Sequence, residues 1–83
     1  MEHKQAIREF VVENFLFGEA NGLKDDTSFL EEGIIDSTGI LELVTYLEDE
    51  YSITVEDEEL VPENLDSISN VAAYLERKIA LNL

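Results

Sequence analysis

This sequence of 83 residues has no cysteine and only one histidine, His3. The absence of cysteine excludes a disulfide framework, a thiol nucleophile and a zinc–thiolate site. His3 stands near the end of the chain, where we expect an exposed side chain, and a Ser-His-Asp arrangement is hard to build from it. A calcium-binding loop of the EF-hand type that started at Asp25 would put Leu30 where glycine is required. We therefore expect no enzyme activity and no bound metal.

Basic residues are also scarce. Five lysines and arginines face twenty acidic residues, which gives a formal net charge of −15. A chain this acidic repels nucleic acid and attracts proteins with basic surfaces. No stretch approaches the ~20 apolar residues that span a bilayer, and residues 1–5 lack the apolar run of a signal peptide. We expect a cytoplasmic protein that binds no nucleic acid and has no transmembrane segment.

Helix-breaking residues are few, with one proline and four glycines. The chain length suits one compact core, so we expect a single domain over residues 1–83. Apolar residues recur at the three- to four-residue spacing of helices with one buried face. The expected fold is all-α: a small four-helix bundle with three longer helices, one short helix and a long loop between helices one and two. We expect helices at residues 2–16, 36–51, 56–60 and 66–79, the loop at 17–35, a short β-like stretch at 52–55, and Pro62 as the end of the short helix.

The second expected helix carries a broad apolar stripe over about four turns. Its charged and polar residues fall mainly on the opposite, exposed side. The stripe consists of Ile40, Leu41, Leu43, Val44, Leu47 and Tyr51, and the exposed side of Glu42, Thr45, Glu48, Asp49 and Glu50.

Ser37 differs from the other four serines in its surroundings. It follows Asp36 at the start of this helix, where backbone N–H groups have no partner within the helix. Such a helix start stabilises an exposed anion, for example a phosphate diester, by ~0.3–1 kcal/mol. Aspartate and serine are also common helix caps. Local chemistry therefore allows two hypotheses: Asp36 and Ser37 only cap the helix, or Ser37 carries a phosphate-linked group.

A longer string around Ser37 favours the second hypothesis by resemblance. Residues 29–44, FLEEGIIDSTGILELV, followed by LEDEY at 47–51, closely resemble the acyl carrier protein family, and residues 53–59 and 66–71 are similar to its later helices. In that family a phosphopantetheinyl transferase attaches 4'-phosphopantetheine, derived from coenzyme A, covalently to the serine after the aspartate. The aspartate helps to coordinate the magnesium used during the transfer. The resemblance thus implies that Ser37 is the attachment point and that Asp36 assists its modification.

The resemblance also implies protein partners. They are the transferase, an acyl- or aminoacyl-loading ligase, and downstream biosynthetic enzymes that bind the carrier through basic docking surfaces. Acidic positions of the family align with Glu42, Glu48 and Asp49, which we expect to bind partners together with Thr38. The alternative for the acidic residues is a solvated helix face.

Two residues beside Ser37 depart from the family pattern. Thr38 stands where many fatty-acid carriers have leucine, and Gly39 where they have an acid. Glycine weakens a helical turn by up to ~1 kcal/mol relative to alanine, so we expect a more mobile segment here. These departures concern the choice of partners.

The implied function is that of a monomeric acyl carrier protein. It would carry acyl intermediates of fatty acid or polyketide biosynthesis as thioesters on the arm at Ser37 and deliver them to separate enzymes. One alternative is a peptidyl or aminoacyl carrier, for example one loaded with D-alanine. A second, of a different class, is an unmodified acidic helical interaction module in which Asp36 and Ser37 are only a cap.

Overall fold

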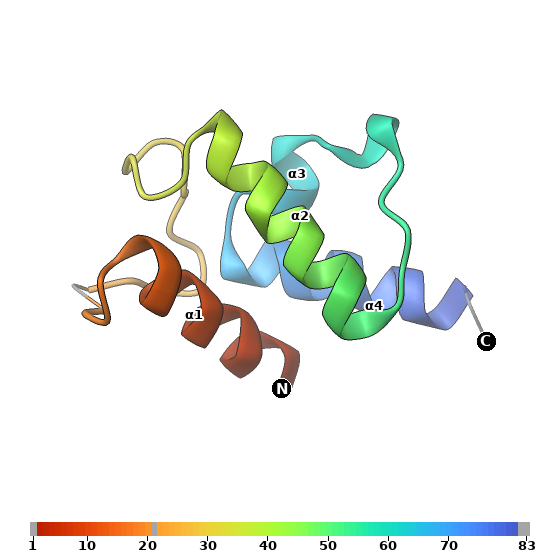
Figure 1. Cartoon of the computed structure of the whole chain (residues 1–83), viewed down its shortest axis with the longest axis horizontal. Coiled ribbons are helices and arrows are strands. Elements are labelled where there is room, and N and C mark those ends of the chain that lie inside the picture. The colour runs from red at the N-terminus through yellow and green to blue at the C-terminus, as the bar shows by residue number, and fades with distance from the viewer. Residues whose placement is uncertain (1, 21, 82–83) are drawn as a thin grey trace.

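The chain folds into helices joined by irregular segments, as seen in a computed structural model that describes residues 2–20 and 22–81. No strand occurs among these residues, which confirms the predicted all-α class. None of the described helices is long and apolar enough to cross a membrane. The helices are α1 (Glu2–Phe15), α2 (Ser37–Tyr51), α3 (Pro62–Leu65) and α4 (Ile68–Leu81), with a 3₁₀ turn, η1 (Asp57–Glu59), before α3 (Figure 1).

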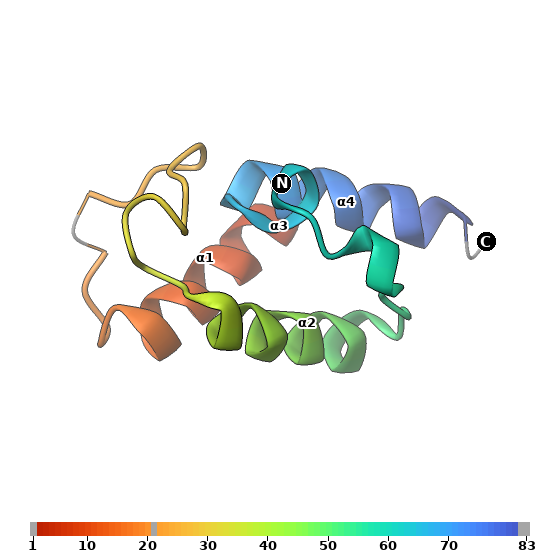
Figure 2. The same ribbon diagram turned by 90° about the horizontal axis from the view of Figure 1, so that it is seen from above.

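The three long helices enclose a single core. Helices α2 and α4 form opposite sides of the bundle, and α1 runs obliquely across both (Figure 2). Helix α3 packs against α4. The core side chains with no exposed surface are Ile7, Val11, Phe29, Leu43, Leu47, Ile68, Val71 and Leu75.

Two side-chain caps fix the starts of α2 and α4. Asp36 has an extended backbone, and its Oδ1 accepts the Gly39 N–H at 2.8 Å. Asp36 is therefore the cap of α2, and Ser37 is its first helical residue. Ser67, which is buried, accepts the Asn70 N–H at 3.1 Å and caps α4. A cap of this kind contributes typically ~1 kcal/mol to stability.

Pro62 was predicted to end a short helix, and this prediction is wrong. The helical residues before it form only the 3₁₀ turn, which ends at Glu59, whereas Pro62 is the first residue of α3. Proline suits that position because the first N–H groups of a helix have no partner within it, and its fixed φ is already helical. The stretch at 52–55 forms no strand, and Ser52 ends α2 with a left-handed φ of 55°.

The loop between α1 and α2 is held by hydrogen bonds to Asp66, just before α4. One carboxylate oxygen of Asp66 accepts the Leu30 N–H at 2.9 Å, and the other accepts the Ser28 hydroxyl. The Asp66 carbonyl accepts the Phe29 N–H at 2.8 Å. Within the loop, the Ser28 hydroxyl also accepts the Glu31 N–H at 3.1 Å and so closes a turn. The loop is therefore ordered by contacts far away in the sequence.

An ion pair ties the same loop to α1. Arg8 Nη2 lies 2.6 Å from Asp25 Oδ1, and Arg8 Nη1 donates to the Leu23 carbonyl at 2.8 Å. The hydrogen bond from Arg8 holds the pKa of Asp25 below its usual value. His3, expected to be exposed, is half-buried with its ring edge-to-face against Tyr51 at a centroid distance of 5.3 Å.

Candidate functional site

Ser37 presents its hydroxyl to solvent at the start of α2. The residue is exposed, and no hydrogen bond involves its side chain within the described part of the chain. The neighbouring Asp36 is exposed as well, although one of its oxygens is held by Gly39. A hydroxyl without a partner is free to be modified, and the N–H groups of the first helical turn lie next to it.

An apolar hollow of about 260 Å³ lies beside Ser37, between α2, α3 and the loop. We call it the Ser37 groove. Its lining includes three large apolar side chains that are substantially exposed: Leu30 at 46%, Leu41 at 56% and Leu60 at 36%. Exposed apolar residues that gather in one place mark a binding surface. The groove is completed by Ile40, Val61, Pro62, Leu65 and Asp66.

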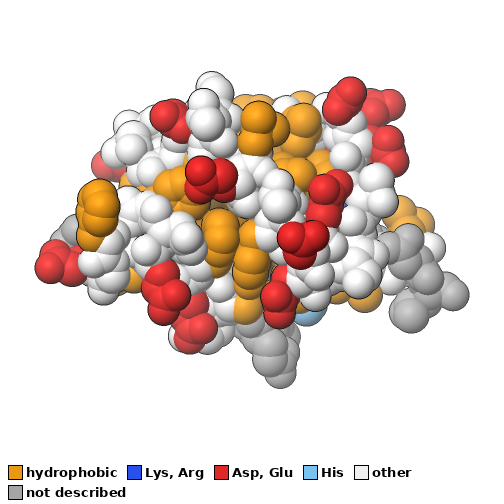
Figure 3. Space-filling view, in the orientation of Figure 1, with side chains coloured by type: hydrophobic (Ala, Val, Ile, Leu, Met, Phe, Trp, Pro, Cys, Tyr) orange, Lys and Arg blue, Asp and Glu red, His pale blue; other side chains and the backbone are white. Residues whose placement is uncertain are grey.

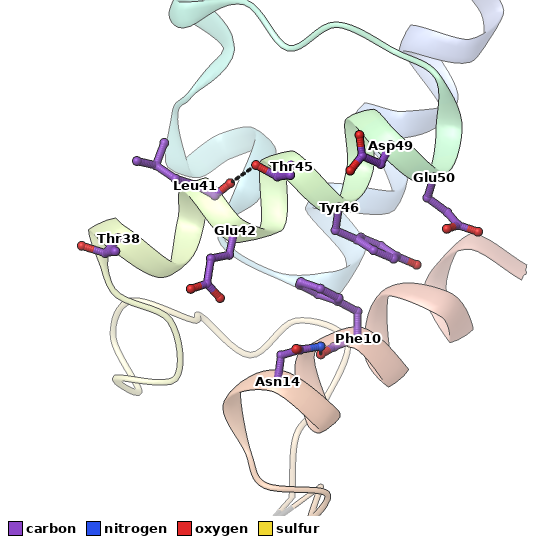
Figure 4. A pocket seen from close by; sticks show the side chains of 9 residues that line it. All are labelled: Phe10, Asn14, Thr38, Leu41, Glu42, Thr45, Tyr46, Asp49 and Glu50. Carbon is purple, nitrogen blue, oxygen red and sulfur yellow. Dashed lines mark hydrogen bonds between the residues drawn. The ribbon is translucent and has the colours of Figure 1, made fainter.

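The predicted partner-binding residues separate into two groups. Thr38, Glu42 and Asp49 line one hollow between α1 and α2 (Figure 4). Glu48 is half-buried, and its Oε2 accepts the Val55 N–H at 2.9 Å, so it holds the segment after α2. The structure brings three of the four residues together and gives the fourth a structural contact.

Leu41 was placed on the buried stripe of α2, which is wrong. The buried residues of this helix are Gly39, Leu43 and Leu47, at intervals of four, and Leu41 falls outside that row. Its side chain is exposed and lines both the Ser37 groove and the hollow that contains Thr38. The four-residue interval was the sequence signal that distinguishes Leu41 from the core.

Comparison with known proteins identifies the family. Residues 5–75 match the family model of a phosphopantetheine attachment site. The chain belongs to the acyl carrier protein family. It is 36% identical over 76 residues to the acyl carrier protein of Helicobacter hepaticus, covering 92% of this chain and 96% of that protein. It is also 31% identical over 67 residues to the probable acyl carrier protein PigG of a Serratia strain, covering 81% and 77%.

A solved structure shares the fold of this carrier. A chain in the "Crystal structure of FAD-dependent dehydrogenase" superposes with a TM-score of 0.74 and 28% identity, over 83% of the present chain and 97% of the other. The matched chain is therefore a small one of similar length. The described residues of this carrier contain no strand, hence no dinucleotide-binding βαβ unit, and the similarity concerns the helical fold.

The prosthetic group of this carrier family is 4'-phosphopantetheine. The surroundings of Ser37 fit such a group, because the hydroxyl is exposed at a helix start and an apolar groove runs beside it. The arm supplies a thiol, which this cysteine-free chain lacks. Family membership gives the chain the role of a carrier.

Gly39 distinguishes the start of α2 in this carrier. It is buried, and a Cβ at this position would lie 2.8 Å from both Ile35 Cγ2 and Phe15 Cε1. The glycine therefore allows the end of α1 and the loop to pack directly against the turn that carries Ser37. Sequence reasoning recognised the cost of glycine to the helix but missed this contact.

Proposed function

We propose that this carrier bears its 4'-phosphopantetheine arm on Ser37 and transports cargo as a thioester on the thiol of that arm. The observation that carries the proposal is the exposed, unpartnered hydroxyl at the first position of α2, directly after the Asp36 cap. It lies within the stretch matched by the family model. Ser37 is our assignment of the attachment point.

Attachment makes one bond and breaks another. The Ser37 oxygen attacks the phosphorus that bears the pantetheine of coenzyme A and gives up its proton to a base of the transferase. The pyrophosphate P–O bond of coenzyme A breaks, and adenosine 3',5'-bisphosphate leaves. The phosphodiester that forms keeps one negative charge, which the start of α2 stabilises by ~0.3–1 kcal/mol. Asp36 is exposed and its orientation is fixed by Gly39, so its carboxylate is available to the magnesium ion of the transferase reaction.

The partners follow from the carrier role. A transferase adds the arm, and a ligase and downstream enzymes load and process the cargo through basic surfaces. We assign Thr38, Glu42 and Asp49 to docking, because they line one open hollow. The similar chain in a structure of an FAD-dependent dehydrogenase supports a flavin-dependent oxidoreductase as one such enzyme. In this proposal the carrier is a single domain over residues 1–83, monomeric and cytoplasmic, performs no bond chemistry of its own and carries no resident metal.

The test is the intact mass of the protein after incubation with coenzyme A, magnesium and a broad-specificity phosphopantetheinyl transferase. We expect the addition of one arm, lost in Ser37→Ala and retained in the matched control Ser69→Ala. Ser69 lies in the first turn of α4, and its side chain makes no hydrogen bond to the described residues. An unchanged mass in the folded wild-type protein would favour the unmodified interaction module.

A second experiment determines which cargo the arm carries. Offering the modified protein to fatty-acyl and aminoacyl donors with their ligases separates an acyl carrier from an aminoacyl carrier. The mass increment identifies the cargo directly.

A further inference from the structure

The Ser37 groove contains one charged side chain, that of Asp66. The other residues that line the groove are apolar, apart from Ser37 itself. The groove reaches the core, since Leu65 in its lining has only 1% of its surface exposed, and Asp66 follows Leu65 directly in the chain. Charged side chains that leave open water are normally paired. The groove therefore combines an apolar surface with a single negative charge.

Hydrogen bonds fix both the backbone and the side chain of Asp66. Its N–H donates to the Pro62 carbonyl at 3.0 Å, and its carbonyl accepts the Phe29 N–H at 2.8 Å. One carboxylate oxygen, Oδ1, accepts the Leu30 N–H at 2.9 Å, and the other accepts the Ser28 hydroxyl. A group that is already fixed loses little conformational freedom when it binds a ligand. Asp66 is therefore a preorganised acceptor in the wall of the groove.

The carboxylate of Asp66 can accept further hydrogen bonds. A carboxylate has about four lone-pair sites, and the two bonds from the loop use one on each oxygen. The ion pairs of the described residues involve Asp25 and Glu59 but not Asp66. No lysine or arginine lines the groove, and none is visible among the described residues on the face seen in Figure 3. Within this part of the chain, the charge of Asp66 is thus open to an external cation.

We propose that Asp66 binds the ammonium group of an aminoacyl cargo carried on Ser37. The inference rests on the proposed function, because the cargo reaches the groove only on the arm at Ser37. The ammonium donates to the remaining sites of the Asp66 carboxylate, and such charge-assisted hydrogen bonds are the strong ones. The apolar walls of the groove cover the hydrocarbon part of the amino acid. Asp66 is then the residue that determines the cargo class, and that class is aminoacyl.

The same geometry discriminates against two other classes of cargo. A plain acyl chain of the same shape covers Asp66 with apolar atoms and returns no hydrogen bond for the water that it displaces. A cargo with a free carboxylate places a second negative charge beside the first. Specificity of this kind comes from the penalty on the wrong ligand as well as from the contact with the right one. We expect the groove to favour ammonium over neutral cargo, and neutral cargo over carboxylate.

A charge-removing variant separates this role of Asp66 from its structural role in the loop. Asp66→Asn keeps the size of the side chain and an oxygen that can accept the Leu30 N–H, and its amide can donate to the Ser28 oxygen. It removes only the negative charge. A ¹⁵N spectrum of the unloaded variant that matches the wild type, apart from residues next to position 66, verifies that the loop is retained.

The experiment measures the pKa of the cargo amine. Ser37 is loaded with ¹³C-labelled leucine through an amide that replaces the thioester, so that the bond does not hydrolyse, and intact mass verifies one addition. A pH titration followed by NMR gives the pKa of the leucine ammonium. A nearby carboxylate favours the charged form and raises this pKa. In Asp66→Asn we expect the proton affinity of the amine to fall about two- to fivefold, a pKa change of ~0.3–0.7, as for a partly exposed ion pair.

The matched control is Glu63→Gln. Glu63 is exposed, stands three residues before Asp66 and does not line the groove. Its removal lowers the net charge equally, and we expect the proton affinity to change by less than about 1.5-fold, because solvent and salt screen an exposed charge. An equal fall in the two variants would show a general charge effect and overturn the inference.

A second measurement needs only the wild-type protein. Ser37 is loaded in the same way with a 4-methylpentanoyl group, which has the shape of leucine without the amine. We expect the Leu30 amide, which donates to Asp66, to shift more with leucine than with this isostere. Equal shifts would overturn the inference and leave the carrier role intact, whereas a Ser37 that accepts no arm would overturn the proposed function and this inference together.

Discussion

Gly39 in α2 and Phe15 at the end of α1 are in such close contact that a methyl group on Gly39 would lie 2.8 Å from a ring carbon of Phe15. The two residues join helix α1 to the turn that presents Ser37. In most helices a glycine lowers the stability of the helix, whereas Gly39 allows α1 to pack closely against α2.

The first prediction concerns this contact. Gly39→Ala should lower the free energy of unfolding by about 1 kcal/mol, because overpacking costs ~1–3 kcal/mol and the gain in helix propensity returns up to ~1 kcal/mol. Urea denaturation followed by circular dichroism measures the change.

A double-mutant cycle supplies the control. Phe15→Leu removes ring atoms near the new methyl group, so Gly39→Ala should cost at least ~0.5 kcal/mol less in that background. A stabilising effect of Gly39→Ala in the wild-type background would show that the packing is not tight.

The second prediction separates the two roles of Asp36. Asparagine caps helices about as well as aspartate, so Asp36→Asn should keep the stability within about 0.5 kcal/mol, whereas Asp36→Ala should lose ~1 kcal/mol. Both should slow modification by about tenfold or more at limiting magnesium, because the carboxylate is gone. Urea denaturation and a mass time course give the two readouts. Normal modification of the asparagine variant would remove Asp36 from the transfer reaction.

The third prediction concerns pH and Glu59. Its carboxylate accepts the Glu56 N–H at 2.9 Å, the Tyr74 hydroxyl at 2.8 Å and the Lys78 ammonium at 3.0 Å. These contacts, the Glu56 hydrogen bond first, lower the pKa of Glu59. A lowered pKa means that the stabilisation is complete above the unfolded-state pKa of about 4.3 and is lost as pH falls through the folded-state value.

Glu59→Gln should therefore be less stable than the wild type at pH 7, and the difference should shrink steadily between about pH 5 and pH 3. Urea midpoints of both proteins across this range provide the measurement. A difference that stays constant with pH would mean that the charge of Glu59 does not contribute.

Local sequence patterns accounted for most of the fold. The periodic apolar residues of α1, α2 and α4 located these helices to within about two residues, because a helix that buries one face has apolar residues at regular intervals in the sequence. The motifs that carried the family resemblance, between residues 29 and 71, lie within the stretch that the family model matches, from residue 5 to residue 75.

The errors arose where one residue type serves two purposes. Proline both ends helices and begins them, and only the contact of α3 with α4 made Pro62 a start. Aspartate and serine both cap helices, so the pair Asp36 and Ser37 left the cap undecided until Gly39 was seen to donate to Asp36.

Other features depend on residues that are distant in the sequence and leave no local trace. Asp66 holds the loop near Leu30, 36 residues earlier. The stacking of Phe10 on Tyr46 needs α1 and α2 side by side, and the predicted apolar stripe of the second helix did not include Tyr46.

Leu41 lines both the Ser37 groove and the hollow that contains Thr38. If an occupant of one hollow moved this side chain, it would change the shape of the other hollow as well. Linkage would then require that a group beside Ser37 and a partner bound at Thr38 alter each other's affinity by the same factor. Such coupling would let the carrier report its loading state without any rearrangement of its helices.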